Sequence, residues 1–253
     1  MPLFMLKDAW KYCMYNKKFF LLLLLFLFVI SYIQDAIAPQ LDSNSSTIVL
    51  VLTLILIMGY GMQITNDRIN HGKKLPAINI KKVLFLGTKA TIVTLVYYLV
   101  QSYILDLVCF PLDFPEFDLS DLLLDLPNTL HMIYSHNPVD TLIFIFTGSI
   151  IFYLFSIFYE LALALIADDK RLLDAFNLKL LIELIEVIGW KKYIVHCTFI
   201  ILAIVILGYF QYISFPYWFL TYAFSIFTLF LMWVTQFMGI GAIYSLIKEG
   251  MSH

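Results

Sequence analysis

The placement of the basic residues between long apolar segments constrains this chain more than any other feature. Six apolar runs cover about residues 19–37, 47–62, 83–108, 141–167, 193–213 and 219–247. A helix rises 1.5 Å per residue, so about 20 apolar residues cross the roughly 30 Å of hydrocarbon in a bilayer. We therefore expect each run to form one membrane-spanning helix.

Six crossings place all 16 basic residues on one side of the membrane: Lys7, Lys11, Lys17, Lys18, Arg68, Lys73, Lys74, Lys81, Lys82, Lys89, Lys170, Arg171, Lys179, Lys191, Lys192 and Lys248. The other side then carries carboxylates alone: Asp35, Asp42, Asp106, Asp113, Glu116, Asp118, Asp121, Asp125 and Asp140. Lys and Arg accumulate in cytoplasmic loops, so both termini are predicted to be cytoplasmic. The expected location is the cell membrane, with multiple crossings.

The composition excludes an ordinary soluble domain. Hydrophobic residues make up 62% of the 253 residues and charged residues only 13%, whereas soluble domains carry about 25% charged residues. We predict an all-α integral membrane protein, a six-span helical bundle that forms a single membrane domain over residues 1–253. The N-terminal run lacks a clear cleavage site and is followed by five more, so we interpret it as a retained span and not a signal peptide.

Two amphipathic segments, residues 3–16 and 173–190, are predicted to lie at the interface and to lead into spans one and five. Each ends in a Lys-Lys pair, in KDAWKYCMYNKKFFLLL and LIELIEVIGWKKYIVHC. Each half then closes on a Gly-x-Gly within a span, Gly59-Tyr60-Gly61 and Gly239-Ile240-Gly241. This pattern suggests a parallel internal repeat of units 3–72 and 173–250, with the helical hairpin 83–167 between them. The alternative is a coincidence of common membrane-boundary residues.

The paired glycines are predicted to pack helices closely, because a helix without a side chain at that position lets a neighbouring backbone approach. The candidates are Gly59, Gly61, Gly239 and Gly241. A phosphate-binding loop is excluded, because no strand precedes either pair.

Two stretches carry a resemblance to a known family. GYGMQITNDRINHGKKLP with KKVLFLGTKATIVTLVYYL, and DAFNLKLLIELIEVIGWKKYI, resemble an archaeal membrane family, domain of unknown function 4013. The similarity covers about residues 59–193, although residues 66–72 are less regular than the family pattern. The resemblance implies a polytopic integral membrane protein and supplies no activity.

Glu160 and Lys89 are the ionisable residues that we expect within spans four and three. Such groups are costly in hydrocarbon and usually face protein or a water-filled cavity. We hypothesise that Glu160 and Lys89 face each other, as an ion pair or as part of a substrate or ion path. The alternative is that Lys89 extends to the interface and Glu160 lies near it.

Catalytic and metal sites are not expected. Asp118, Asp121 and Asp125, with His131 and His136 downstream, could supply oxygen and nitrogen ligands, but no calcium loop or HExxH motif is present. The three cysteines form no CxxC pair, and no G-x-S-x-G occurs. We therefore predict no enzyme activity, no cofactor and no metal.

The sequence favours a non-enzymatic scaffold or accessory subunit of a membrane complex, since ionisable groups within the spans are scarce. The alternative is a small transporter or channel with a polar path near Glu160 and Lys89, and an enzyme that acts on lipid is a third option. Expected partners are anionic lipid headgroups at the cytoplasmic face and a protein partner or a second copy of the chain. Nucleic acid is not expected.

Overall fold

The computed structural model describes residues 2–32, 43–109, 134–135, 137–211, 213 and 215–251. Within them, all regular structure is helical, which confirms the all-α prediction. The elements, in chain order, are α1 (Pro2–Met14), α2 (Lys17–Tyr32), α3 (Ser43–Ile69), α4 (Ile80–Cys109), α7 (Pro138–Ala167), the 3₁₀ helix η3 (Leu172–Phe176), α8 (Leu178–Ile188), α9 (Trp190–Phe210) and α10 (Trp218–Met251).

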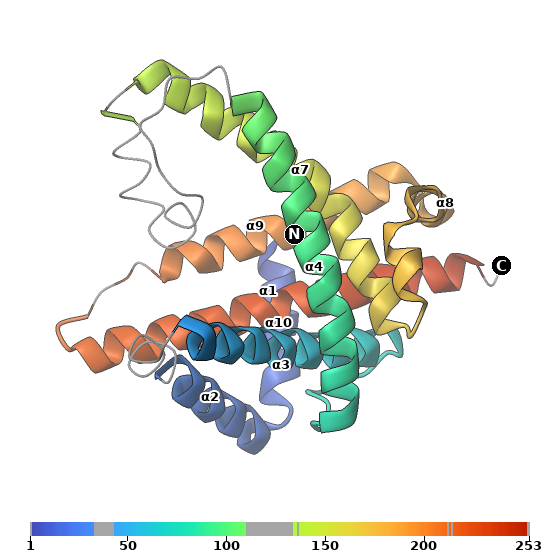
Figure 1. Cartoon of the computed structure of the whole chain (residues 1–253). Helices are drawn as coiled ribbons and strands as arrows, with labels where there is room; N and C mark the ends of the chain where they lie inside the picture. Colours follow the sequence, from blue (N-terminus) through green and yellow to red (C-terminus); the bar gives the residue numbers. More distant parts are fainter. Residues whose placement is uncertain are drawn as a thin grey trace. The chain divides into compact units, whose positions relative to one another are not determined.

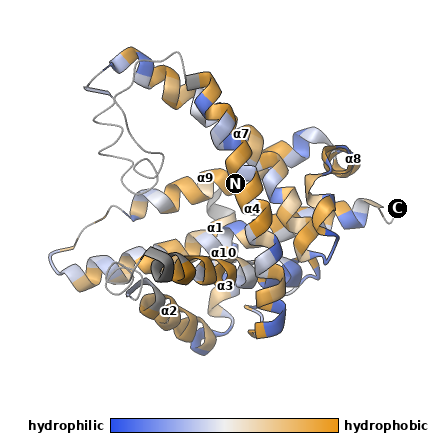
Figure 2. Ribbon diagram, viewed as in Figure 1, coloured by the Kyte–Doolittle hydropathy of each residue, from blue (hydrophilic) through white to orange (hydrophobic). Residues whose placement is uncertain are grey.

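Among the described residues, five helices are long and apolar enough to cross a membrane: α3, α4, α7, α9 and α10. The count rises to six if α1 and α2, which are bent by 100° at the break between Met14 and Lys17, form one span. Apolar residues cover most of the length of these helices (Figure 2). The chain is thus a multi-pass membrane protein, with up to six crossings among the described residues. Span one was predicted over 19–37; α2 is described as far as Tyr32, and the rest of the predicted span lies outside the described part of the chain.

The second span is longer than predicted. The helix α3 continues past Met62 to Ile69. It ends where His71 adopts a left-handed conformation (φ 59°). There the amide of His71 donates to the carbonyl of Arg68, and the amide of Gly72 to that of Asp67. This pair of bonds is a Schellman motif, which terminates helices.

The single helix predicted over 173–190 is wrong, because η3 and α8 divide it. Asn177 caps α8 by accepting a hydrogen bond from the amide of Leu180 (3.2 Å). Gly189 ends α8 at φ 85°, a conformation that favours glycine. The helix α8 is amphipathic as expected: it buries Leu181, Leu184 and Ile185, and Lys179 forms an exposed ion pair with Glu183 (3.9 Å).

The helices form two compact units, Met1–Val93 with Phe158–His253, and Thr94–Ile157. In the first unit α10 lies alongside α3 and α9, and α1, α2 and α8 also contact it (Figure 1). The core includes Tyr193, Phe230, Phe237 and Tyr244, all nearly inaccessible to solvent. Each predicted repeat unit contains a short helix followed directly by a longer one, α1–α2 and α8–α9, and the repeat itself stays a prediction.

The second unit contains the later part of α4 and the earlier part of α7. Large apolar side chains such as Leu99 and Phe146 are exposed on it. In a membrane protein, such surface is solvated by lipid.

Candidate functional site at the polar helix ends

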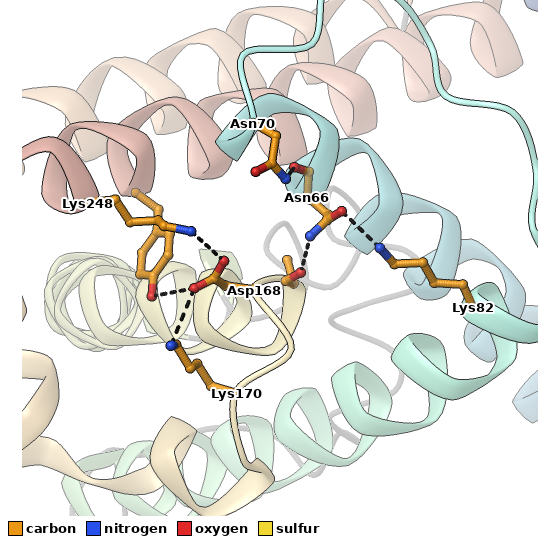
Figure 3. Close-up of polar contacts among 8 residues, drawn as sticks. Asn66, Asn70, Lys82, Asp168, Lys170 and Lys248 are labelled. Atoms are coloured by element: carbon orange, nitrogen blue, oxygen red, sulfur yellow. Dashed lines mark hydrogen bonds and ion pairs between the residues drawn. The ribbon is translucent and has the colours of Figure 1, made fainter.

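Asn66 joins three helices through one side-chain amide. Its Nδ2 donates to the carbonyl oxygen of Ala167 (2.7 Å), and its Oδ1 accepts from Nζ of Lys82 (2.9 Å) (Figure 3). Ala167 is the last residue of α7, and the carbonyls of a final helical turn have no partner within their own helix. Asn66 of α3 therefore satisfies the end of α7 and at the same time holds the start of α4.

Asp168 forms the second part of this cluster. Its Oδ1 lies 2.9 Å from Nζ of Lys248 on α10, and its Oδ2 lies 3.8 Å from Nζ of Lys170. The phenol of Tyr244 donates to Oδ2 (3.4 Å) (Figure 3). The lysines place positive charge at the C-terminal end of α7, where the helix dipole is negative. Asp168 and Asn66 thus fasten α3, α4, α7 and α10 together; we call these residues, with Lys82, Lys170, Tyr244 and Lys248, the end latch.

The backbone at the end of α7 repeats the motif seen at the end of α3. Asp169 has φ 59°, its amide donates to Ile166, and the amide of Lys170 donates to Leu165. This is again a Schellman motif, with Asp169 at the position that glycine usually occupies. Asp and His tolerate the left-handed conformation better than most residues.

The helices α3, α4, α7 and α10 meet at this end of the first unit, together with Lys82, Lys170 and Lys248. The N-terminal helix reaches it as well, because the phenol of Tyr12 donates to Oδ2 of Asp67 (2.7 Å). The first helix of the chain and the last, which contributes Lys248, thus lie at the same end. This arrangement agrees with the sorting of charge in the sequence, and the assignment of this end to the cytoplasm stays a prediction.

The structure places Glu160 and Lys89 with different partners. Glu160 is buried (2% exposed); the thiol of Cys197 on α9 interacts with its carboxyl group, and Oε2 has no hydrogen-bond partner in the structure. Nζ of Lys89 lies 3.5 Å from the carbonyl oxygen of Lys170 and 4.3 Å from the centre of the Phe85 ring. None of the ion pairs between described residues joins Glu160 to Lys89. The long side chain of Lys89 reaches the polar end instead, the alternative named above.

Gly59 lies where α3 crosses α4. A Cβ atom there would come within 2.7 Å of the carbonyl carbon of Val83 and closer still to its oxygen. Gly87 faces the same crossing from α4, where a Cβ would lie 2.9 Å from the carbonyl carbon of Ile55 and 3.1 Å from Cα of Gly59. The two backbones therefore touch directly. Gly87 was not among the predicted packing residues, because it stands alone in its span with no second glycine to mark it.

The other three predicted glycines also lie at helix contacts. A Cβ at Gly61 would meet the Phe237 ring of α10 at 2.5 Å, and one at Gly239 would meet the Ile200 side chain of α9 at 2.6 Å. Gly241 faces α3, where a Cβ would lie 2.7 Å from the carbonyl oxygen of Thr65 and from Cβ of Arg68. Each Gly-x-Gly therefore lies at two helix contacts. The pair Gly59 and Gly61 lies at the contacts of α3 with α4 and with α10, and the pair Gly239 and Gly241 lies at the contacts of α10 with α9 and with α3.

The described residues contain no group of three His, Cys, Asp or Glu side chains that could hold a metal ion. The acidic segment with Asp118, Asp121 and Asp125, and the histidines His131 and His136, lie outside the described residues. Cys13 and Cys197 are free and buried.

A family model described as "Protein of unknown function (DUF4013)" matches residues 45–216. No curated protein and no solved structure matches the chain.

Proposed function

This chain belongs to the DUF4013 family of proteins of unknown function, so its role must be argued from its own geometry, and we propose that it is a non-enzymatic scaffold or accessory subunit of a membrane complex. The proposed location is the cell membrane. The proposed partners are anionic lipid headgroups at the basic face and a protein partner or a second copy of the chain, without nucleic acid.

The observation that carries the proposal is the direct packing of helices in the first unit. Helix backbones touch at Gly59 and Gly87, and the Tyr60 ring stacks on Trp233 with centroids 5.8 Å apart. A hollow of about 290 Å³ beside this stack is lined by apolar and aromatic side chains. Such an interior supports a rigid platform, whereas a transport path through it would need polar groups along its length.

The polar groups of the end latch support the same role. The side chains of Asn66 and Asp168 form hydrogen bonds with other residues of the protein. They therefore fix the helix ends and do not line an open path. The outward face of α8 exposes Leu178 and Ile182 beside the charged Lys179 and Glu183. A mixed apolar and charged helix face of this kind suits contact with a partner protein or with the membrane surface.

The test combines native extraction with a flux assay. The full chain, purified gently from its own membrane, is expected to retain a partner or a second copy at fixed stoichiometry. Liposomes that contain the purified protein are expected to hold an imposed pH or sodium gradient as long as protein-free liposomes. Flux above the protein-free rate, together with a solitary monomer after extraction, would refute the scaffold role.

One observation favours the second candidate, a small transporter or channel. Glu160 is buried, and one of its carboxyl oxygens has no hydrogen-bond partner among the described residues. If flux is found, E160Q is expected to abolish it, whereas K89Q, whose ammonium lies at the polar end, is expected to preserve it.

A further inference from the structure

A continuous groove opens on the first unit between α1, α3, α9 and α10. It consists of two hollows of about 320 and 440 Å³ that share Arg68, His196 and Ala242. The first hollow is largely apolar, with Met5, Phe199 and Met238 among its lining residues. The second is lined also by His71, Lys73, Ser245 and Glu249, and we call it the polar hollow because of these side chains. Charged side chains are therefore concentrated at one end of a groove whose surface is otherwise largely apolar.

Arg68 stands where the two hollows join. Its stem passes Gly241 of α10, where even one added carbon would lie 2.7 Å from Cβ of Arg68. The guanidinium donates from Nη1 to the carbonyl oxygen of Gly72 (3.2 Å), and no ion pair to it forms among the described residues. Arginine has five N–H donors, so most of them remain available to a ligand.

His196 is held on the other side of the groove. Its Nε2 lies 3.2 Å from the carbonyl oxygen of Gly239, and a carbonyl only accepts, so Nε2 carries a proton. The two glycines of Gly239-Ile240-Gly241 thus shape the groove: one orients His196 through its carbonyl, and the other makes room for Arg68.

The charges of the groove favour an anion at the polar hollow. Glu249 is the carboxylate that lines the polar hollow, 3.6 Å from the ring of the exposed His71, and Asp8 lines the apolar hollow. Arg68 and the exposed Lys73 give the polar hollow two cations against this one carboxylate. Arginine and lysine are the residues that bind phosphate most often, arginine through two parallel N–H bonds.

We propose that this groove binds a phosphate ester, with Arg68 and Lys73 on the phosphate and the apolar hollow along the adjoining hydrocarbon of an anionic phospholipid. Free phosphate could make the same contacts with Arg68 and Lys73, but it has no hydrocarbon to pack against Met5 and Met238. The inference rests on the membrane location in the proposed function and not on the scaffold role, which can fail while the groove still binds phosphate.

The test uses the full-length protein and two probes. Native mass spectrometry of the protein, titrated with equal amounts of phosphatidylglycerol and phosphatidylcholine, gives the Kd of the first lipid bound. Calorimetric titration with inorganic phosphate, in nanodiscs of phosphatidylcholine alone, gives the affinity for the free anion. The variants are R68Q, K73Q and the matched control K74Q, whose side chain is exposed next to Lys73 but does not line the groove.

In the wild type, the first phosphatidylglycerol is expected to bind at least about tenfold more tightly than phosphatidylcholine. R68Q is expected to remove most of this preference, K73Q to reduce it about threefold, and K74Q to leave it unchanged. Binding of inorganic phosphate that depends on Arg68, without a lipid preference, would support the site with free phosphate as its ligand.

Two results would overturn the proposal: no Arg68-dependent binding of either probe, or equal losses in K73Q and K74Q. A change in the melting midpoint of R68Q would signal damage to the fold. In that case the lipid preference is judged from two other variants: K73Q, which lies at an exposed position, and R68K, which keeps the positive charge.

Discussion

Replacing Gly59 with alanine should separate α3 from α4. The added Cβ would lie 2.7 Å from the carbonyl carbon of Val83 and closer still to its oxygen. These are backbone atoms of a helix, so they cannot rotate away as a flexible side chain could. The two helices must therefore move apart by about 1 Å to restore ordinary contact distances.

The cost follows from the contacts that this movement weakens. An atom pair at its optimal distance contributes about 0.1–0.2 kcal/mol, and a gap of about 0.5–1 Å removes a quarter to a half of it. With roughly 20 atom pairs across the crossing, the loss is about 0.5–2 kcal/mol, which overlaps the range of about 1–3 kcal/mol for overpacked cores. For a chain of this size we expect the melting midpoint to fall by about 1–8 °C.

The assay is thermal unfolding of the detergent-purified protein, followed by intrinsic fluorescence. G148A is the matched control, because a Cβ there would find Leu105 at 3.6 Å, an ordinary contact, and it is expected to hold or slightly raise the midpoint. G87A should behave like G59A. The double variant should lose less than the sum of the two, because the first substitution has already separated the helices.

Equal midpoints for G59A, G87A and G148A would refute direct backbone contact between α3 and α4. Strict additivity in the double variant would show instead that the two glycines act at separate contacts.

Two further comparisons test the helix ends, both by the same melting measurement. D168N removes the charge that pairs with two lysines, and it should lower the free energy of unfolding by about 1 kcal/mol. D169N keeps a residue that tolerates φ 59°, so it should leave the free energy of unfolding nearly unchanged. Equal losses of stability in the two variants would contradict the end latch. G189A forces alanine to φ 85° in otherwise open space, and it should lower the free energy of unfolding by about 1 kcal/mol. G208A also lies in open space but in an ordinary helix, so it should leave stability unchanged or raise it. A G189A protein as stable as the wild type would contradict the break between α8 and α9.

The order of the long apolar helices could be predicted, because the length of each apolar run and the charges between the runs can be read directly from the sequence. The residue at which α3 ends could not be predicted in this way. Its last turns contain Gln63 and Thr65, polar residues that the structure buries. Thr65 donates to the carbonyl of Phe237 (3.0 Å) and Gln63 to that of Asn79 (3.1 Å). Tertiary contacts of this kind keep polar residues in a helix, and composition alone gives no sign of them.

The end latch was missed for a related reason. Asn66 begins the stretch that departs from the family pattern, so a local signal was present, but its partners Ala167 and Lys82 are distant in sequence. The sequence gives the depth of Glu160 and Lys89 along their helices but not the direction in which each side chain points. The predicted pairing of these two residues therefore depended on how each helix is rotated about its axis, and the structure gives the two side chains different neighbours.

The sidedness of the polar end is tested most directly by labelling single cysteines in intact cells that express the protein. The three native cysteines are replaced first, and K74C and Y217C are then compared with a membrane-impermeant maleimide. Both positions are exposed; Lys74 follows α3, and Tyr217 precedes α10. The account predicts that Y217C is labelled from outside and that K74C is labelled only after the cells are opened. Labelling of K74C in intact cells would contradict it.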